Sequence, residues 1–271
     1  MDSTILSLQE MAHFEKWGYV RVSQALSDTF VEKVRVVIWR EMERQYGVLE
    51  SNPATWNLRW PSINKNSIDT FAGTEVTTRL AGAIDQLLGK GQWRSIRTFG
   101  GLLMTLPEQK PHAWDMVAKG WHFDHDPRFS IGKVDELMLF TFYSSIRAQG
   151  GGTLVLAGSH KGAEAFCQSE KTAQGLFIHE YLTAFGHWHP YLAQLQGHQP
   201  RAWSTQQWLE TTASVHGIEM RVTELTGEPG DAILCHPGLL HATGQNASAF
   251  PRLMRRTNIH RRKSEQQTVG Q

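Results

Sequence analysis

The pattern His122-Phe123-Asp124, followed by His241 at an interval of 119 residues (241 minus 122), constrains this chain more than any other feature. Side chains two positions apart on an extended segment point the same way, so His122 and Asp124 can offer a nitrogen and a carboxylate oxygen to one ion. One distant histidine then completes a set of two histidines and one carboxylate. That set occupies one face of an octahedral metal and leaves the opposite face open, as in non-heme Fe(II) centres.

Other histidines suit this site less well. His125 is adjacent to Asp124 and faces away from it if the segment is extended. His236 lies five residues before His241, an interval that puts the two on opposite faces of a regular strand. The run from 187 to 189, His-Trp-His, lacks a carboxylate or cysteine at ligand spacing, which favours substrate contact or packing there.

The stretch at residues 227–256, GEPGDAILCHPGLLHATGQNASAFPRLMRR, carries several further features in a fixed order. A Gly-Asp turn leads into an apolar strand, then a His-Pro pair, then His241, an asparagine and, eleven residues after His241, an arginine. These features are Gly230-Asp231, the run from Ala232 to Leu234, His236-Pro237, Asn246 and Arg252. The order resembles that of the phytanoyl-CoA dioxygenase family of Fe(II)/2-oxoglutarate oxygenases.

The resemblance extends from about residue 14 to about residue 258 and is loose between about 162 and 222. It includes a glycine turn with a following strand at residues 150–154, and the element Gly158-Ser159-His160. It implies a protein that binds Fe(II), uses 2-oxoglutarate and O2 as co-substrates and releases succinate and CO2. The implied reaction is oxidation of a C–H bond, with hydroxylation first among the possible outcomes, on a small polar or specialised metabolite.

Under this resemblance His122, Asp124 and His241 are the iron ligands, and Arg252 binds the distal carboxylate of 2-oxoglutarate. A planar guanidinium matches a carboxylate better than a lysine does. Thr243 lies two residues after His241 and can support the same carboxylate. Arg255 and Arg256 lie close by and are the alternatives to Arg252, and the interval of eleven residues selects Arg252. Four further residues are candidate substrate contacts: Trp121, Arg128, Trp188 and His189.

A second interpretation is a cupin-like metal protein, such as an isomerase or another protein that is not an oxygenase. Such proteins usually place several histidines and a glutamate on the barrel. They have no need of an arginine eleven residues after the last ligand, so the position of Arg252 favours the oxygenase.

The composition limits the domain number, the binding partners and the cellular location that can be expected for this chain. The chain has 271 residues and 40% hydrophobic content, enough for one domain over residues 1–271. Lys+Arg and Asp+Glu nearly cancel, 27 against 26, so neither nucleic acid nor an anionic membrane is expected as a partner. The start lacks a basic and apolar leader, no run approaches the ~18 apolar residues of a span, and the two cysteines, Cys167 and Cys235, form no C-x-x-C pair. A cytoplasmic protein, monomer or homodimer, is expected.

The periodicity predicts a mainly β fold with supporting helices: a double-stranded β-helix, or cupin-like jelly roll. Helices are expected within residues 1–93, among them one that begins after Ser27 and ends at Gly47 and another over about 76–88. Residues 53–66 are expected to form an ordered loop. The jelly-roll core is assigned to about 94–160 and 218–260, and residues 261–271 form a polar tail.

The segment over about residues 161–217 interrupts the rhythm of short strands. It shows helical patterns at 163–174, 191–196 and 205–215 and is rich in aromatic residues. An insertion between two core strands can cover the open end of a barrel, so this segment is expected to form a lid over the substrate. The alternative is a packing annex or a dimer surface.

Overall fold

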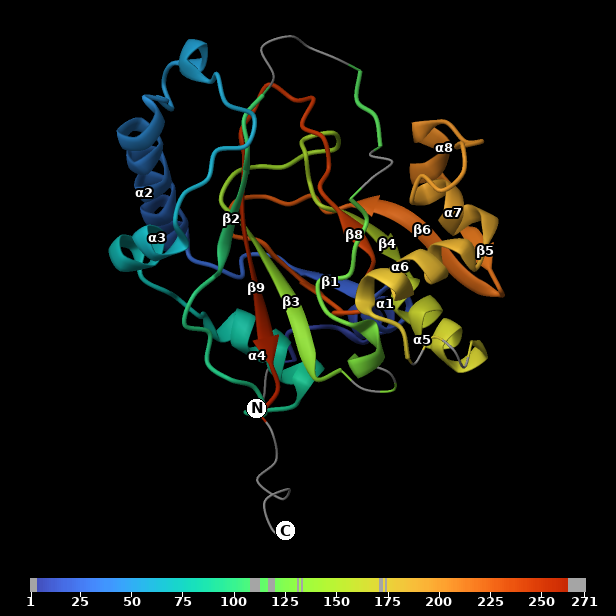
Figure 1. Cartoon of the computed structure of the whole chain (residues 1–271). Coiled ribbons are helices and arrows are strands. Elements are labelled where there is room, and N and C mark those ends of the chain that lie inside the picture. Colours follow the sequence, from blue (N-terminus) through green and yellow to red (C-terminus); the bar gives the residue numbers. More distant parts are fainter. Residues whose placement is uncertain are drawn as a thin grey trace.

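Two antiparallel sheets stacked face to face form the centre of the protein (Figure 1). The computed structural model describes residues 4–107, 113–116, 120–130, 132, 134–170, 173 and 175–262. The larger sheet has the order β1 (Tyr19–Val22), β7 (Ala232–Cys235), β3 (Glu136–Phe142), β9 (Arg252–His260), β2 (Gly101–Thr105). The smaller has the order β5 (Ala213–Val215), β6 (Ile218–Glu224), β4 (Leu154–Ala157), β8 (His241–Ala242). The predicted double-stranded β-helix is confirmed.

The space between the sheets is filled by every second side chain of the strands that border it. Met138, Phe140 and Phe142 of β3 share one buried cluster with Val155 of β4 and Met254 of β9. Side chains that alternate along a strand point to opposite faces, so the neighbours of these residues pack on the outside of each sheet. Leu103, which packs against this cluster, also lines the cavity described below.

Four N-terminal helices flank the larger sheet: α1 (Leu8–Trp17), α2 (Asp28–Tyr46), α3 (Lys65–Ala72) and α4 (Thr78–Leu88). Residues of α2, α3 and α4 share one buried cluster with Leu137 and Leu139 of β3 on the outer face of this sheet. The Ser27 side chain accepts a hydrogen bond from the Phe30 amide and begins α2, and Gly47 ends it with φ of 65°, as predicted.

Helices α1 and α3 were not predicted. Residues 53–66 form the expected loop up to Asn64, with a short 3-10 turn at Pro53–Thr55, but its last two residues begin α3. The jelly-roll core was assigned from about residue 94, and the first strand in that range, β2, begins at Gly101.

The insertion covers the outer face of the smaller sheet. Its helices are α5 (Ser159–Ser169), α6 (Ile178–His187), α7 (Pro190–Leu195) and α8 (Thr205–Glu210). Phe166, Phe185 and Leu192 of these helices share a buried cluster with Leu154 and Leu156 of β4. In Figure 1, α2 and α3 lie on one side of the strands and α5 to α8 on the other.

The helix predicted over residues 205–215 is wrong in its second half. It ends at Glu210, and Ala213–Val215 form β5, which pairs with β6 through the turn at positions 216 and 217. A three-residue strand has too little periodicity to be separated from a helix end. Within the part of the chain that the structure describes, no helix is both long and apolar enough to cross a membrane.

Candidate active site

Backbone pairing brings the His-x-Asp segment to the distant histidine. The His122 amide donates to the His241 carbonyl at 2.9 Å, and the His241 amide donates back to the His122 carbonyl at 3.0 Å. His241 in turn lies opposite Val155 of β4 in the smaller sheet. The segment around His122 therefore extends this sheet beyond β8, and two side chains 119 residues apart face each other, with ring centroids 4.3 Å apart.

Nitrogen and oxygen atoms of His122, Asp124 and His241 all lie within 4.8 Å of one another. Oδ1 of Asp124 is 3.5 Å from Nε2 of His122, and Oδ2 of Asp124, which also contacts Arg256, is 3.1 Å from Nε2 of His241. Two ligands at right angles, each about 2.1 Å from an ion, lie about 3 Å apart, so these separations suit neighbouring ligands of one ion.

The ring orientation also favours a metal. Nδ1 of His122 lies 2.7 Å from the Gly120 carbonyl, and Nδ1 of His241 lies 3.0 Å from the Leu239 carbonyl. A carbonyl oxygen can only accept, so each Nδ1 carries a proton and each Nε2 faces Asp124, where a metal ion would replace the Nε2 proton. Both histidines are thus oriented to bind a metal through Nε2.

The charge state of Asp124 suits the same role. Burial raises the pKa of this carboxyl, but hydrogen bonds from His122 and His241 and the positive charge of Arg256 outweigh burial and hold the pKa well below its usual range. The hydrogen bond to Asp124 raises the pKa of His122. An ionised carboxylate between two imidazoles is the donor set that Fe(II) takes in a facial triad, and the three residues fit that ion.

A second set of contacts fixes the loop that precedes His241. The Ser159 hydroxyl accepts a hydrogen bond from the Leu240 amide at 2.8 Å, and the Leu240 carbonyl accepts from the Leu156 amide at 2.8 Å. His160 stacks against His236, with ring centroids 4.8 Å apart. The Gly-Ser-His element and the His-Pro pair, noted in the sequence as separate motifs, therefore form one clamp on the loop that carries the distal histidine.

Arg252 is a buried cation. Its side chain, in a residue only 2% exposed, donates to the Thr153 hydroxyl at 3.0 Å and to the Met254 sulfur at 3.3 Å. No carboxylate of the described residues forms an ion pair with it. Burial lowers the pKa of Arg252, the negative charge of Glu224 opposes part of this lowering, and the resulting pKa is about 10. A buried charge without a counter-ion is costly, so this guanidinium is suited to an anionic ligand.

The two neighbouring arginines already have partners. Arg255 points to the outer face of the sheet, where Nη2 lies 2.7 Å from Asp69 of α3 and 2.9 Å from the Gly100 carbonyl. Arg256 points inward and forms an ion pair with Asp124. Of the three, Arg252 alone combines an inward position with the lack of an ion-pair partner in the described chain.

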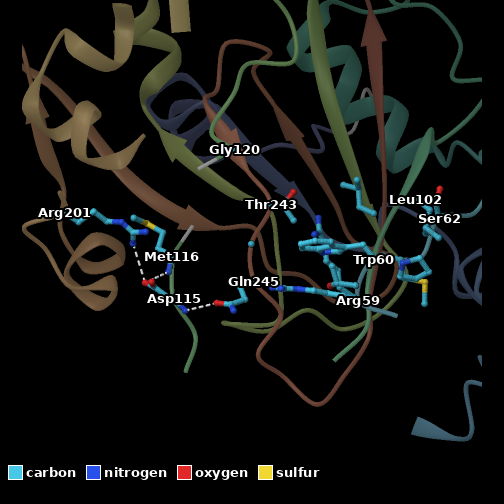
Figure 2. A pocket seen from close by; sticks show the side chains of 16 residues that line it. Arg59, Trp60, Ser62, Leu102, Asp115, Met116, Gly120, Arg201, Thr243 and Gln245 are labelled. Carbon is cyan, nitrogen blue, oxygen red and sulfur yellow. Dashed lines mark hydrogen bonds and ion pairs between the residues drawn. The ribbon is translucent and has the colours of Figure 1, made fainter. Parts of the chain in front are cut away.

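A cavity of about 830 Å³ opens beside these groups. Thr243, Arg252 and Gly120 line it next to the triad segments. Figure 2 shows two walls, one that includes Arg59 and Trp60 and one that includes Asp115 and Arg201. Thr243 and Gln245 lie between the walls in that view.

Four residues predicted to touch substrate lie away from this cavity lining. Trp121 is buried in the hydrophobic cluster beneath the insertion, and Trp188 packs against the same cluster. Arg128 pairs with Asp126 and donates to the Ala173 carbonyl at 2.8 Å. His189 accepts a hydrogen bond from the Tyr191 amide and caps α7. Their contact with substrate stays a prediction.

Several cavity residues were not predicted. Arg59 and Trp60 come from the loop between α2 and α3, where the guanidinium lies 4.5 Å from the indole centroid. The sequence signal was present as an ordered, tryptophan-rich loop, but nothing in it indicated which way the loop folds. Asp115 and Arg201 approach each other to 3.4 Å from segments 86 residues apart, a proximity that only the tertiary structure reveals.

The chain resembles known proteins both in its sequence and in its fold. The family model described as Phytanoyl-CoA dioxygenase (PhyH) matches residues 110–254. No curated protein matches the chain. Many solved structures do. The structure of HygX from Streptomyces hygroscopicus with nickel and 2-oxoglutarate has a TM-score of 0.55 and 15% identity, covering 94% of this chain and 87% of that chain.

Two other solved structures also match most of this chain. EctD from S. alaskensis with 2-oxoglutarate and 5-hydroxyectoine has a TM-score of 0.52 and 17% identity, over 96% of this chain and 78% of that one. The carbocyclase SnoK from nogalamycin biosynthesis, described as non-heme and alpha ketoglutarate dependent, has a TM-score of 0.51 and 13% identity, over 98% and 91%. At these identities the likeness is one of fold.

The clamp of His160 and His236 predicts a pH-dependent stability. Burial lowers the pKa of His160 to about 4 and that of His236 to about 3, from an ordinary value of 6.5. As pH falls below 6.5, the unfolded chain therefore takes up protons before the folded protein does, and the free energy of unfolding falls by roughly 2 kcal/mol for each histidine by about pH 5. Urea unfolding at about pH 7.5 and about pH 5 measures this loss.

The variant His236→Gln is expected to lose less stability between those two pH values than the wild-type protein. His179→Gln, at an exposed histidine of α6, serves as the control and should behave as wild type. Equal losses in all three proteins would show that the clamp does not set the pH dependence.

Proposed function

This chain belongs to the phytanoyl-CoA dioxygenase family of Fe(II)/2-oxoglutarate oxygenases, and we propose that it hydroxylates a C–H bond of a small polar or specialised metabolite. The observation that carries the proposal is the pairing of two sites: the His122, Asp124 and His241 triad, and a buried Arg252 that forms no ion pair with any residue the structure describes. A cupin-like isomerase would not need the second site, and family membership removes the support for that alternative.

Each residue has a defined part in this chemistry. His122, Asp124 and His241 would hold Fe(II), which when bound activates O2 at the expense of 2-oxoglutarate and yields succinate and CO2. Arg252 would bind the distal carboxylate of 2-oxoglutarate in a buried ion pair, with the Thr243 hydroxyl beside it. Closure of the cavity over a bound substrate would exclude bulk water around the reacting C–H bond.

The cavity walls support a polar substrate. Trp60, Met116 and Leu102 offer apolar surface, while Arg59 and Arg201 place positive charge near the opening. A mixed lining of this kind fits a small molecule with apolar and polar or anionic groups. EctD was solved with the small polar molecule 5-hydroxyectoine, which agrees with this class without identifying the substrate.

A test of the metal site uses Asp124→Ala. We expect Mn(II) affinity to fall by more than about a hundred-fold, because one of three protein ligands is lost. Incubation of the wild-type protein with Fe(II), ascorbate, 2-oxoglutarate and a metabolite extract under 18O2 should add one labelled oxygen atom to a product detected by mass spectrometry. The variant should form none. Full metal occupancy and normal product in Asp124→Ala would refute the assignment.

A test of the co-substrate site uses Arg252→Gln. We expect the KM for 2-oxoglutarate to rise about ten- to a hundred-fold, because a charge-assisted contact contributes roughly 1.5–3 kcal/mol. Metal affinity should stay near that of the wild type. Arg35→Gln is the control: it removes an exposed ion pair between Arg35 of α2 and Glu50, and it should leave the KM for 2-oxoglutarate unchanged.

The insertion is proposed to act as a lid through the segment that follows α7. Thr205 donates a short hydrogen bond to Asp115, and Arg201 lies 3.4 Å from the same carboxylate. Asp115 is also tied to Gln245, since its amide donates to the Gln245 side chain at 3.0 Å. These contacts join the insertion to the cavity wall, whereas helices α5 to α7 pack on the outside of the sheet.

The lid proposal predicts that Thr205→Val combined with Arg201→Ala uncouples the reaction. The ratio of succinate to hydroxylated product should rise, because the cavity wall loses its anchor and admits water. Gln206→Ala, on the same helix but bonded to Glu210, is the matched control. An unchanged ratio in the double variant would favour a packing annex or a dimer surface.

A further inference from the structure

Besides the two histidines, the Asp124 carboxylate contacts Arg256, which is not one of the proposed metal ligands. Arg256 forms an ion pair with Oδ2 of Asp124 through Nη2. Both groups are mostly buried, with the Arg256 side chain 24% exposed and the Asp124 side chain 20% exposed. An ion pair shielded from water holds its geometry better than one on the surface, where such pairs contribute little.

The position of Arg256 follows from strand alternation. Arg252, Met254 and Arg256 are spaced by two along β9 and point between the sheets, whereas Arg255 points outward to Asp69. Nη2 of Arg256 also donates to Oδ1 of Asn258 at 2.8 Å. The guanidinium is therefore held by its own strand at the side of Asp124.

This contact bears on how many coordination positions the protein occupies. An octahedral ion has six positions; the triad takes three if Asp124 binds through one oxygen, and 2-oxoglutarate and O2 need the other three. A carboxylate that bound through both oxygens would take a fourth position. One of the co-substrates would then be displaced.

We propose that Arg256 is a positioning residue that holds one oxygen of Asp124, so that only the other oxygen is available to Fe(II). The inference rests on the metal site proposed above. It assigns Arg256 a role different from that of Arg252: Arg252 binds a co-substrate, whereas Arg256 keeps a coordination position open for one. The guanidinium suits this role because its Nη2 contacts both Asp124 and Asn258, and the planar group keeps that nitrogen in a fixed direction.

The experiment compares Arg256→Met, which removes the guanidinium and keeps an unbranched side chain, with Arg256→Lys, which keeps the charge. Mn(II) affinity is measured by calorimetry, and 2-oxoglutarate affinity is measured on the Fe(II) protein without O2 by visible absorption. In Arg256→Met we expect Mn(II) affinity to equal or exceed that of the wild type, since both oxygens become available and a nearby positive charge is lost.

The same variant should bind 2-oxoglutarate about ten-fold more weakly, because the second oxygen of Asp124 competes for its position. Arg256→Lys should recover part of that loss. Arg35→Gln should match the wild type in both measurements, and thermal unfolding followed by circular dichroism establishes that each variant is folded.

Two results would overturn the inference. Wild-type affinity for 2-oxoglutarate in Arg256→Met would show that the ion pair does not protect a coordination position. A loss of Mn(II) affinity as large as in Asp124→Ala would show that Arg256 supports the ligand itself. If instead Asp124→Ala bound Mn(II) as the wild type does, the proposed metal site would fail and this inference with it.

Discussion

The reciprocal backbone hydrogen bonds between His122 and His241 are the contact on which the rest of the site depends. They place two imidazoles on adjacent extended segments and set Asp124 within reach of both. Each imidazole is then oriented by a carbonyl two residues earlier in its own segment, at Gly120 and at Leu239. The same local device occurs on both sides, so the orientation of the two imidazoles comes from the backbone.

Much of this site could be predicted from the sequence. The i, i+2 spacing of His122 and Asp124 predicted that both could reach one ion, and the structure pairs His122 with His241 and places Asp124 within reach of both. The helix from Ser27 to Gly47 was equally accessible, because its capping residues at both ends are local signals. The jelly roll followed from short strands separated by glycine turns. These features depend on neighbours in the sequence or on strong periodicity.

Features that depend on tertiary contacts could not be predicted in the same way. Helix α3 is only eight residues long, and its buried residues Ile68 and Ala72 show too short a pattern to stand out. Arg59 and Arg201 line the cavity because of how two loops fold back, which no local pattern encodes. The aromatic residues of the insertion suggested a substrate pocket, but Trp188 stacks instead on His216, with ring centroids 4.3 Å apart. Aromatic content alone does not separate a lid from a packed layer.

The three arginines of β9 have different roles because each faces different partner groups. Arg255 is directed outward by the alternation of the strand and is matched by Asp69, so it ties α3 to the sheet. Arg256, one residue later, faces inward and is matched by Asp124. Arg252 also faces inward but has only the Thr153 hydroxyl and the Met254 sulfur as side-chain partners in the described chain. Since a buried cation is stable only with a counter-ion or an equivalent set of dipoles, the lack of an ion pair among the described residues supports the proposal that Arg252 binds an anionic ligand. The interval of eleven residues from His241 thus has a physical meaning, because it brings the unmatched arginine, and neither of the two matched ones, to the cavity beside the metal ligands.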